Sequence, residues 1–177
     1  ATWTVLGADV FGPAYSEPAG QYPQYDAVGK VRVDPNNSSK VIAGTKKGLF
    51  VSYDGGVNWT GPCTTNSYST QRQDITGLEL SNLGNGSTRI IAAVGVRGFA
   101  TAVQYDLGAN GANGLYKAMM PNSGCPSFTS ITSDSNGFVI GAKLLGAGSG
   151  TPYLSGGNQL GRIDMAIAPM DSNVIYA

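Results

Sequence analysis

Histidine is absent from this 177-residue chain, and charged side chains of either sign are scarce. Without imidazole the chain has no His-based acid–base catalyst, no Ser–His triad and few of the ligands that build zinc sites. Charged residues make up 12% of the chain, against the usual share of roughly 25%, and they sum to zero net charge. No basic stripe is present to neutralise phosphates, so we expect no nucleic-acid partner. We also expect no metal and no cofactor.

Long apolar runs and helical periodicity are also missing. No stretch approaches the ~20 apolar residues that a membrane helix needs, so we expect no membrane span. No window repeats apolar residues at i, i+3, i+4 and i+7 over three turns, and glycine interrupts most candidate helices. Both absences point away from helical architectures.

Cysteine occurs only twice, at Cys63 and Cys125. A bond between them would close a loop of about 60 residues and stabilise the fold by on the order of 4 kcal/mol. Two buried free thiols are the alternative reading. The bridge is favoured because few charges together with much Gly, Ser, Thr and Asn are common in exported proteins. We therefore expect a secreted, extracellular protein.

What the chain does have is glycine, 26 of 177 residues, and short runs of β-branched and aromatic residues separated by turn sequences. The turns include DPNNSSK, DGGVN, LGNGST and PNSG, whose residues preset a turn or tolerate positive φ. The expected strands lie at 30–33, 40–45, 48–53, 75–80, 89–95, 114–119, 138–143, 164–169 and 173–177. This spacing predicts an all-β fold.

The order of strands and turns repeats along the chain. The pattern strand, polar turn, strand occurs in the segments 31–45, 77–95 and 165–177. Taking Val33 and Leu80 as equivalent gives a period of about 47 residues, which matches a propeller blade of four short strands. A second unit, opening with Gly-Leu-aromatic and ending on a large aromatic, recurs at 48–59 and 114–128.

Within the first of these units, Ser52, Asp54, Gly56 and Trp59 fit the pattern Ser-x-Asp-x-Gly-x-x-Trp. The chain therefore resembles the Asp-box, or BNR, β-propellers, a group that includes sialidases, xyloglucan-active glycosidases and sortilin-type receptors. In the second unit, 114–128, the box is degenerate. The resemblance implies four-stranded antiparallel blades, with about three to four blades' worth of sequence present.

The box itself is interpreted as scaffolding. Asp54 is suited to accept hydrogen bonds from the backbone of its own turn, Gly56 permits angles that a side chain would forbid, and Trp59 supplies an apolar plug. In the propellers that the chain resembles, this turn joins the two outer strands, away from the central channel. Asp54 also lacks a neighbouring acid with which to catalyse.

Blade boundaries follow from the same resemblance. We expect an outer strand of a preceding blade at 1–10, a first blade at 30–62, a second at 74–130 and an incomplete third at 138–177. Because propellers need four to eight blades, we expect the remaining blades in a longer precursor, a second chain or a self-associated copy. Open sheet edges and uncovered faces would otherwise promote association.

Candidate site residues lie in the loops that enter the expected innermost strands, whose central residues are 30–33, 77–80 and 165–168. The catalytic candidates are Asp26, Asp74 and Asp164, since paired carboxylates carry out glycoside hydrolysis. The ligand-binding candidates are Tyr15, Tyr22, Tyr25, Arg72 and Arg162. Tyrosine rings can stack on sugars. The alternative for each Asp is that it closes a turn or pairs with a neighbouring Arg.

Two functions remain in competition at this level. The first is binding or hydrolysis of carbohydrate by a secreted Asp-box propeller, with glycoside hydrolysis as the reaction if the protein is an enzyme. The second is a non-catalytic protein-interaction or self-assembling module. A complete sialidase site is not expected, because the only glutamates are Glu17 and Glu79 and no Tyr–Glu pair can be recognised.

Overall fold

The computed structural model describes residues 2–11, 28–45, 48–63, 74–95, 114–131, 163–168 and 170–177. Within these ranges the regular structure is mostly antiparallel sheet, and the one helix is a single turn, α1, at Ala8–Phe11. The all-β prediction is therefore confirmed. The expected strand at 138–143 lies outside the described residues.

The first sheet contains β1 (Val28–Asp34), β2 (Asn37–Thr45) and β3 (Gly48–Ser52) in that order. Its strands contain five valines together with Ile42 and Phe50, residue types that pack well on a pleated surface. A paired bridge between Val51 and Thr60 continues the sheet beyond β3, with N–H···O distances of 2.8 and 2.9 Å.

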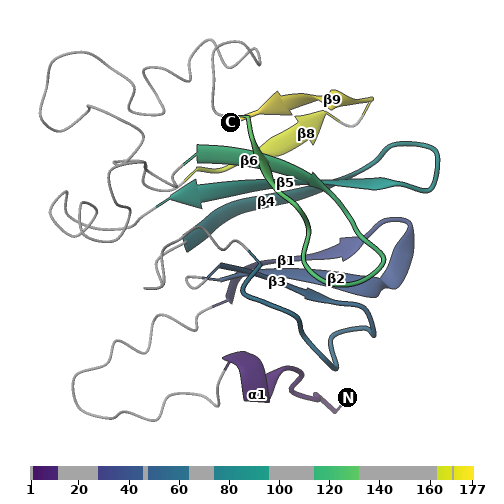
Figure 1. The fold of residues 1–177 in the computed structure, drawn as a ribbon, viewed down its shortest axis with the longest axis vertical. Helices are drawn as coiled ribbons and strands as arrows, with labels where there is room; N and C mark the ends of the chain where they lie inside the picture. Colours follow the sequence, from purple (N-terminus) through teal and green to yellow (C-terminus); the bar gives the residue numbers. More distant parts are fainter. Residues whose placement is uncertain are drawn as a thin grey trace, which may run out of the picture.

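The second sheet contains β4 (Asp74–Asn82), β5 (Thr88–Gly95), β6 (Gly114–Met119) and β7 (Thr129–Ser130), again in chain order. The third sheet consists of β8 (Ala166–Ala168) and β9 (Asp171–Tyr176). Figure 1 shows the three sheets as successive layers, with the second sheet between the other two.

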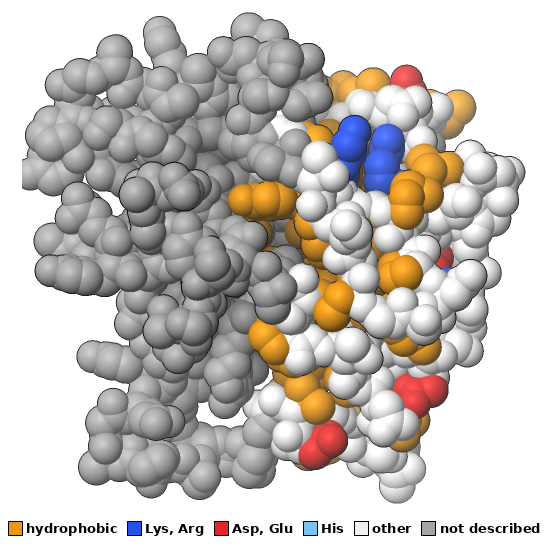
Figure 2. Space-filling view, viewed as in Figure 1, with side chains coloured by type: hydrophobic (Ala, Val, Ile, Leu, Met, Phe, Trp, Pro, Cys, Tyr) orange, Lys and Arg blue, Asp and Glu red, His pale blue; other side chains and the backbone are white. Residues whose placement is uncertain are grey.

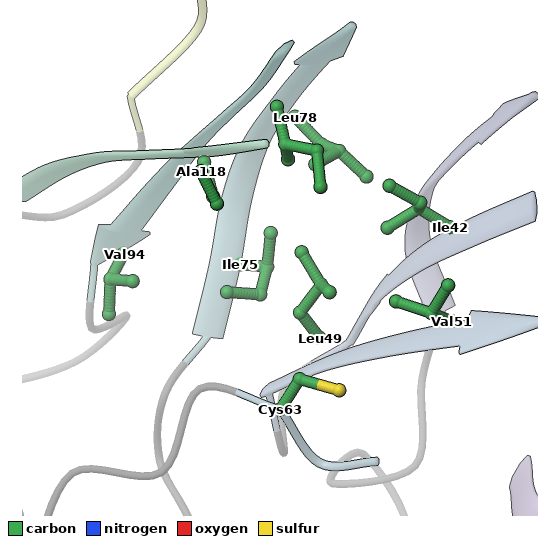
Figure 3. Close-up of a cluster of buried hydrophobic side chains, with 10 residues drawn as sticks. Ile42, Leu49, Val51, Cys63, Ile75, Leu78, Val94 and Ala118 are labelled. Atoms are coloured by element: carbon green, nitrogen blue, oxygen red, sulfur yellow. The ribbon is translucent and has the colours of Figure 1, made fainter. Parts of the chain in front are cut away.

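A core of aliphatic side chains joins the first sheet to the second. Ile42, Leu49 and Val51 point from the first sheet toward Ile75 and Leu78 of β4 (Figure 3). All five are 1% exposed or less. Gly44 makes the close packing possible, because a Cβ there would lie 2.6 Å from Cγ2 of Ile75. The sheets thus meet face to face through alternating residues.

A second core joins the second sheet to the third. Ile91, Ala93 and Leu115 pack with Ile163, and partly buried apolar side chains of the third sheet cover them. A Cβ at Gly77 would lie 2.8 Å from the carbonyl oxygen of Ile163, so the chain entering β8 crosses β4 closely at this glycine. Both faces of the second sheet are therefore buried.

The start of the chain differs from the expected outer strand over 1–10. Residues 2–7 form no strand, and α1 is closed by the Gly7 carbonyl, which accepts from the N–H groups of Val10 and Phe11 at 3.0 and 2.8 Å. Phe11 then packs edge-to-face on Phe50 and Trp59, with ring centroids 5.3 and 5.0 Å away. Aromatic contact with the first sheet outweighs the strand-like local sequence.

Candidate functional site

The first strands of the three sheets lie next to one another. β1 contacts β4, and β4 contacts β8. Of the charged side chains described on or just before these strands, four form two ion pairs: Lys30, Arg32, Glu79 and Asp164. We call these four residues the inner-edge cluster.

Arg32 and Glu79 form the tighter pair. Nη2 of Arg32 lies 2.6 Å from Oε1 of Glu79, and Nε lies 3.4 Å from Oε2, so the guanidinium engages both carboxylate oxygens. Arg32 also donates through Nη1 to the carbonyl of Val31 at 3.0 Å. Both side chains are partly shielded from water, with 36% and 23% exposed. A fork-to-fork pair of this kind fixes the carboxylate in one orientation.

Lys30 and Asp164 form the looser pair, which links the first sheet to the segment leading into β8. Nζ of Lys30 lies 3.4 Å from Oδ1 of Asp164, whose side chain is 62% exposed. The backbone around Asp164 is held by the neighbouring Ile163, whose N–H donates to Oγ1 of Thr76 at 3.1 Å. The carboxylate is therefore anchored at its backbone and open to solvent at its tip.

Of the predicted catalytic carboxylates, only Asp164 has a described side chain. Asp74 is the first residue of β4, and its backbone pairs with Gly95. Asp26 lies outside the described residues. So do the predicted ligand-binding residues Tyr15, Tyr22, Tyr25, Arg72 and Arg162.

Three members of the inner-edge cluster were not among the predicted site residues. Lys30, Arg32 and Glu79 lie within β1 and β4, whereas the predicted site residues lie in the loops that enter the strands. A signal was nevertheless present, because Arg32 and Glu79 are separated by 47 positions, the repeat period itself. Opposite charges one period apart on first strands become neighbours when successive sheets stack.

The Ser52–Trp59 turn holds the residues of the predicted box in one hydrogen-bonded unit. Ser52 donates its hydroxyl hydrogen to Oδ1 of Asp54 at 2.8 Å and accepts from the N–H of Gly56 at 2.8 Å. Trp59 donates through Nε1 to the carbonyl of Gly56 at 2.8 Å. Gly56 has φ 99°, an angle that a side chain rarely adopts.

Both carboxylate oxygens of Asp54 accept hydrogen bonds from within this turn. It accepts from the N–H groups of Val57 and Asn58 at 3.0 and 2.9 Å, and from Nδ2 of Asn58 at 2.7 Å. The backbone N–H of Asn58 is the largest cause that lowers the pKa of Asp54 to about 2, followed by the Asn58 amide and the Ser52 hydroxyl. A carboxylate bound in this way closes a turn and is poorly suited to donate a proton.

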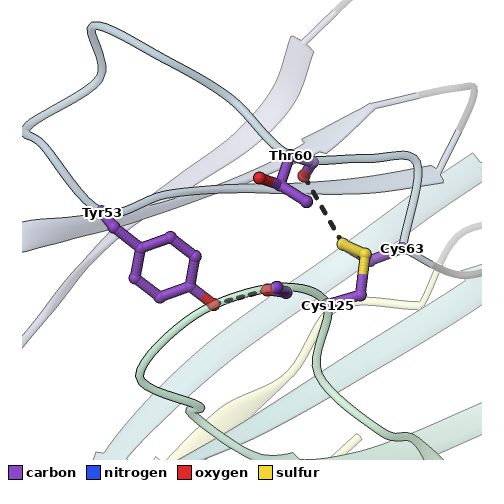
Figure 4. The surroundings of a disulfide bond; sticks show 5 residues. Tyr53, Thr60, Cys63 and Cys125 are labelled. Carbon is purple, nitrogen blue, oxygen red and sulfur yellow. Dashed lines mark hydrogen bonds between the residues drawn. A yellow bond between two sulfur atoms is a disulfide. The ribbon is translucent and has the colours of Figure 1, made fainter.

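Beside this turn, the chain that follows β6 is fastened to the first sheet. A disulfide joins Cys63 to Cys125, with Cα atoms 5.1 Å apart, and Figure 4 shows its surroundings. The hydroxyl of Tyr53 donates to the carbonyl of Gly124 at 2.5 Å. Nζ of Lys40 donates to the carbonyl of Pro121 at 3.0 Å. The bridge that the sequence favoured over two free thiols is therefore present.

Among the described residues, no group of three or more His, Cys, Asp or Glu side chains is arranged to hold a metal ion. No helix in the same part of the chain is long and apolar enough to cross a membrane.

Comparison with known proteins gives little to add to this geometry. No model of a known protein family matches the chain, and no curated protein matches it. Among solved structures, the chain is similar to the crystal structure of an ancestral GH74 enzyme, with 18% sequence identity and a TM-score of 0.47. The match covers 85% of this chain and 16% of that one, so the chain spans about a sixth of the length of that enzyme.

Proposed function

We propose that this chain is part of a secreted Asp-box β-propeller that binds or hydrolyses carbohydrate. The observation that carries the proposal is the inner-edge cluster, in which Glu79 and Asp164 are carried by the first strand of the second sheet and the approach to the third. Two carboxylates on one ligand-facing edge are what glycoside hydrolysis requires, and carboxylates also bind sugar hydroxyls well.

The roles of the two acids differ under this proposal. Glu79 is held in a fixed orientation by Nε and Nη2 of Arg32 and is the group suited to act on a precisely placed atom. The side chain of Asp164 is mostly exposed, with Nζ of Lys30 3.4 Å from its Oδ1, so a ligand in solvent can reach this carboxylate. Arg32 and Lys30 are positioning residues.

The propeller assignment is supported by local geometry. Hydrogen bonds join Ser52, Asp54, Gly56 and Trp59 within one turn that follows β3, and such a closed turn supports reading these residues as an Asp-box. Sheets that are antiparallel, follow chain order and place their first strands together have the arrangement of propeller blades.

Further blades would complete the propeller. On the first sheet, the β1 side chains of Val28, Val31 and Val33 are 41%, 51% and 53% exposed. Figure 2 shows apolar side chains scattered over one face of the molecule, with a few charged side chains among them. A neighbouring blade would cover such valines, whether it comes from a longer precursor, a second chain or another copy. The disulfide supports an oxidising, extracellular location.

The intact protein that contains this chain tests the function directly. We would measure binding on a glycan array and hydrolysis of a polysaccharide panel, for the wild type and for Glu79→Gln and Asp164→Asn. Asp9→Asn serves as a control, because Asp9 lies on α1 and is exposed. The proposal expects a sugar that is bound or cleaved, with a loss in the first two variants only. Absence of any bound or cleaved sugar would contradict it.

The alternative is a non-catalytic interaction module, and the exposed valines of β1 are the observation that favours it. Replacing Val31 and Val33 by Thr keeps the β-propensity of the strand but lowers its apolar area. If these valines form an assembly surface, light scattering on the wild type shows an oligomer that the double variant loses. A wild type that is monomeric by light scattering would exclude self-assembly through this face.

A further inference from the structure

The turn between β4 and β5 contains the one Asn-Gly sequence among the described residues, Asn85-Gly86. Asn85 is exposed, and its Oδ1 accepts a hydrogen bond from the N–H of Ser87 at 3.0 Å. An acceptor two residues before its donor is an Asx turn, which folds the side-chain amide over the next peptide group. The hydrogen bond keeps the side-chain amide of Asn85 folded toward the backbone that follows it.

We propose that this turn is a site of spontaneous modification, at which Asn85 deamidates through attack by its own backbone. The nitrogen of Gly86 loses its proton to water and bonds to Cγ of Asn85, giving a tetrahedral carbon. The Cγ–Nδ2 bond then breaks, and ammonia leaves after taking up a proton. Water opens the cyclic imide at either carbonyl and yields aspartate or isoaspartate at position 85. Water is the only co-reactant.

The hydrogen bond from the Ser87 N–H orients the Asn85 side chain and also stabilises the charge that develops during the reaction. Oδ1 of Asn85 becomes an oxyanion in the tetrahedral intermediate, and the Ser87 N–H is already aimed at it. A fixed donor at the atom where negative charge develops lowers the barrier. Gly86 contributes by its lack of a side chain: the residue is exposed, and a Cβ at this position would meet nothing within 4 Å, so no neighbouring group crowds it.

Two other asparagines provide matched comparisons. Oδ1 of Asn82 accepts from the N–H of Gly84 at 2.8 Å, and Oδ1 of Asn37 accepts from the N–H of Ser39 at 3.0 Å. Both form the same Asx turn as Asn85, but Leu83 and Ser38 follow them, and a side chain there crowds the attacking nitrogen. The structure thus separates the effect of the turn from the effect of glycine.

Modification of Asn85 would disturb the hydrogen bonds that join the first two sheets. Nδ2 of Asn36 donates to the carbonyl of Ser87 at 3.1 Å and to Oγ1 of Thr88 at 2.8 Å. Isoaspartate inserts an additional methylene into the backbone just before Gly86 and so displaces the Ser87 carbonyl. Ageing at Asn85 would therefore loosen the contact between the β1–β2 and β4–β5 turns.

Peptide mapping by mass spectrometry after incubation of the intact protein at mildly alkaline pH tests the proposal. Trypsin releases residues 73–89 as one peptide, which carries both Asn82 and Asn85, so the two sites are compared within one molecule. We expect conversion at Asn85, with both aspartate and isoaspartate, and none at Asn82 or Asn37. Equal conversion at Asn82 and Asn85 would overturn the proposal.

Two variants and one condition sharpen the test. Asn85→Ser should abolish the conversion in this peptide, and Ser38→Gly should create a second site at Asn37, because it supplies the missing glycine to an identical turn. The folded protein should convert Asn85 at least as fast as the protein in concentrated urea. A slower reaction in the folded protein, or an unreactive Asn37 in Ser38→Gly, would contradict the role given to the turn.

Discussion

The hydroxyl of Tyr53 donates a hydrogen bond to the carbonyl oxygen of Gly124 at 2.5 Å, and so joins the Ser52–Trp59 turn of the first sheet to the chain that follows β6 in the second. The disulfide between Cys63 and Cys125 lies beside this contact (Figure 4). In the second sheet the chain after β6 lacks the box residues. Contacts with its neighbour hold it in place instead.

The Tyr53 contact predicts a dependence of stability on alkaline pH. Burial raises the pKa of Tyr53, so the folded state binds the phenolic proton more tightly than the unfolded state does. Its contribution is fully present below the unfolded pKa of about 10 and is lost as pH rises through the folded pKa. Urea denaturation at several pH values should show a steeper alkaline loss for the wild type than for Tyr53→Phe.

The same substitution has an expected effect at neutral pH. Tyr53→Phe leaves the Gly124 carbonyl without this donor, and we expect the free energy of unfolding to fall by about 1 kcal/mol. Equal stability of the two proteins at pH 7, together with parallel alkaline curves, would show that the Tyr53–Gly124 bond contributes nothing.

From the lowered pKa of Asp54 we predict that the stability of the fold decreases at acid pH. Its pKa is lowered to about 2 in the folded state from a model-compound value of 3.8, so the carboxylate contributes stability that is present above pH 3.8 and lost as pH falls through about 2. Asp54→Asn removes that contribution. Acid titrations followed by circular dichroism should therefore diverge between pH 2 and 4. Identical curves for the two proteins would contradict the hydrogen bonding assigned to Asp54.

Removal of the disulfide should weaken the fold markedly. We expect Cys63→Ser with Cys125→Ser to lower the free energy of unfolding by about 2–5 kcal/mol, since the bond restricts a long loop in the unfolded chain. A reducing agent provides the control: it should destabilise the wild type to a similar extent and leave the double variant unchanged. An equal effect of the reductant on both proteins would show that the reductant does not act by reducing this disulfide.

Two glycines of the first sheet test the packing against β4. At Gly44 a Cβ would lie 2.6 Å from Ile75, whereas at Gly29 it would meet nothing closer than 3.8 Å. We expect Gly44→Ala to destabilise the protein by about 1–3 kcal/mol through overpacking. Gly29→Ala should change stability far less. Thermal or urea unfolding distinguishes them, and similar values for both would contradict the close approach of the sheets.

The strands could be predicted because the residues that determine them lie within each strand and in the turns beside it. Runs such as RIIAAV and KVIAGT are β-branched and lie between turn sequences, and β5 and β2 form at these places. The segment at residues 2–7 carries similar local information, yet it forms no strand in the structure. There the outcome depends on Phe11 reaching Phe50 and Trp59, a contact between distant parts of the chain.

The candidate site was less accessible to sequence reasoning for the same reason. Asp164 is predicted as a site residue because it lies at the entry to an expected strand, whereas Glu79 lies inside one, where local sequence gives no sign of a site. The place of Glu79 in the candidate site depends on Arg32, which becomes its neighbour only when the first two sheets stack. Local patterns indicate which residues are extended, whereas the pairing of charges between sheets follows from the packing of Ile75 against Gly44 and its surroundings.

The most direct test of the central claim is hydrogen–deuterium exchange of the intact protein with and without the oligosaccharide selected on the glycan array. Binding at the inner-edge cluster predicts protection in peptides that cover 28–34, 74–82 and 163–168, while the Ser52–Trp59 turn stays unchanged. Protection confined to the Ser52–Trp59 turn, or no protection in the three first-strand peptides, would contradict the account.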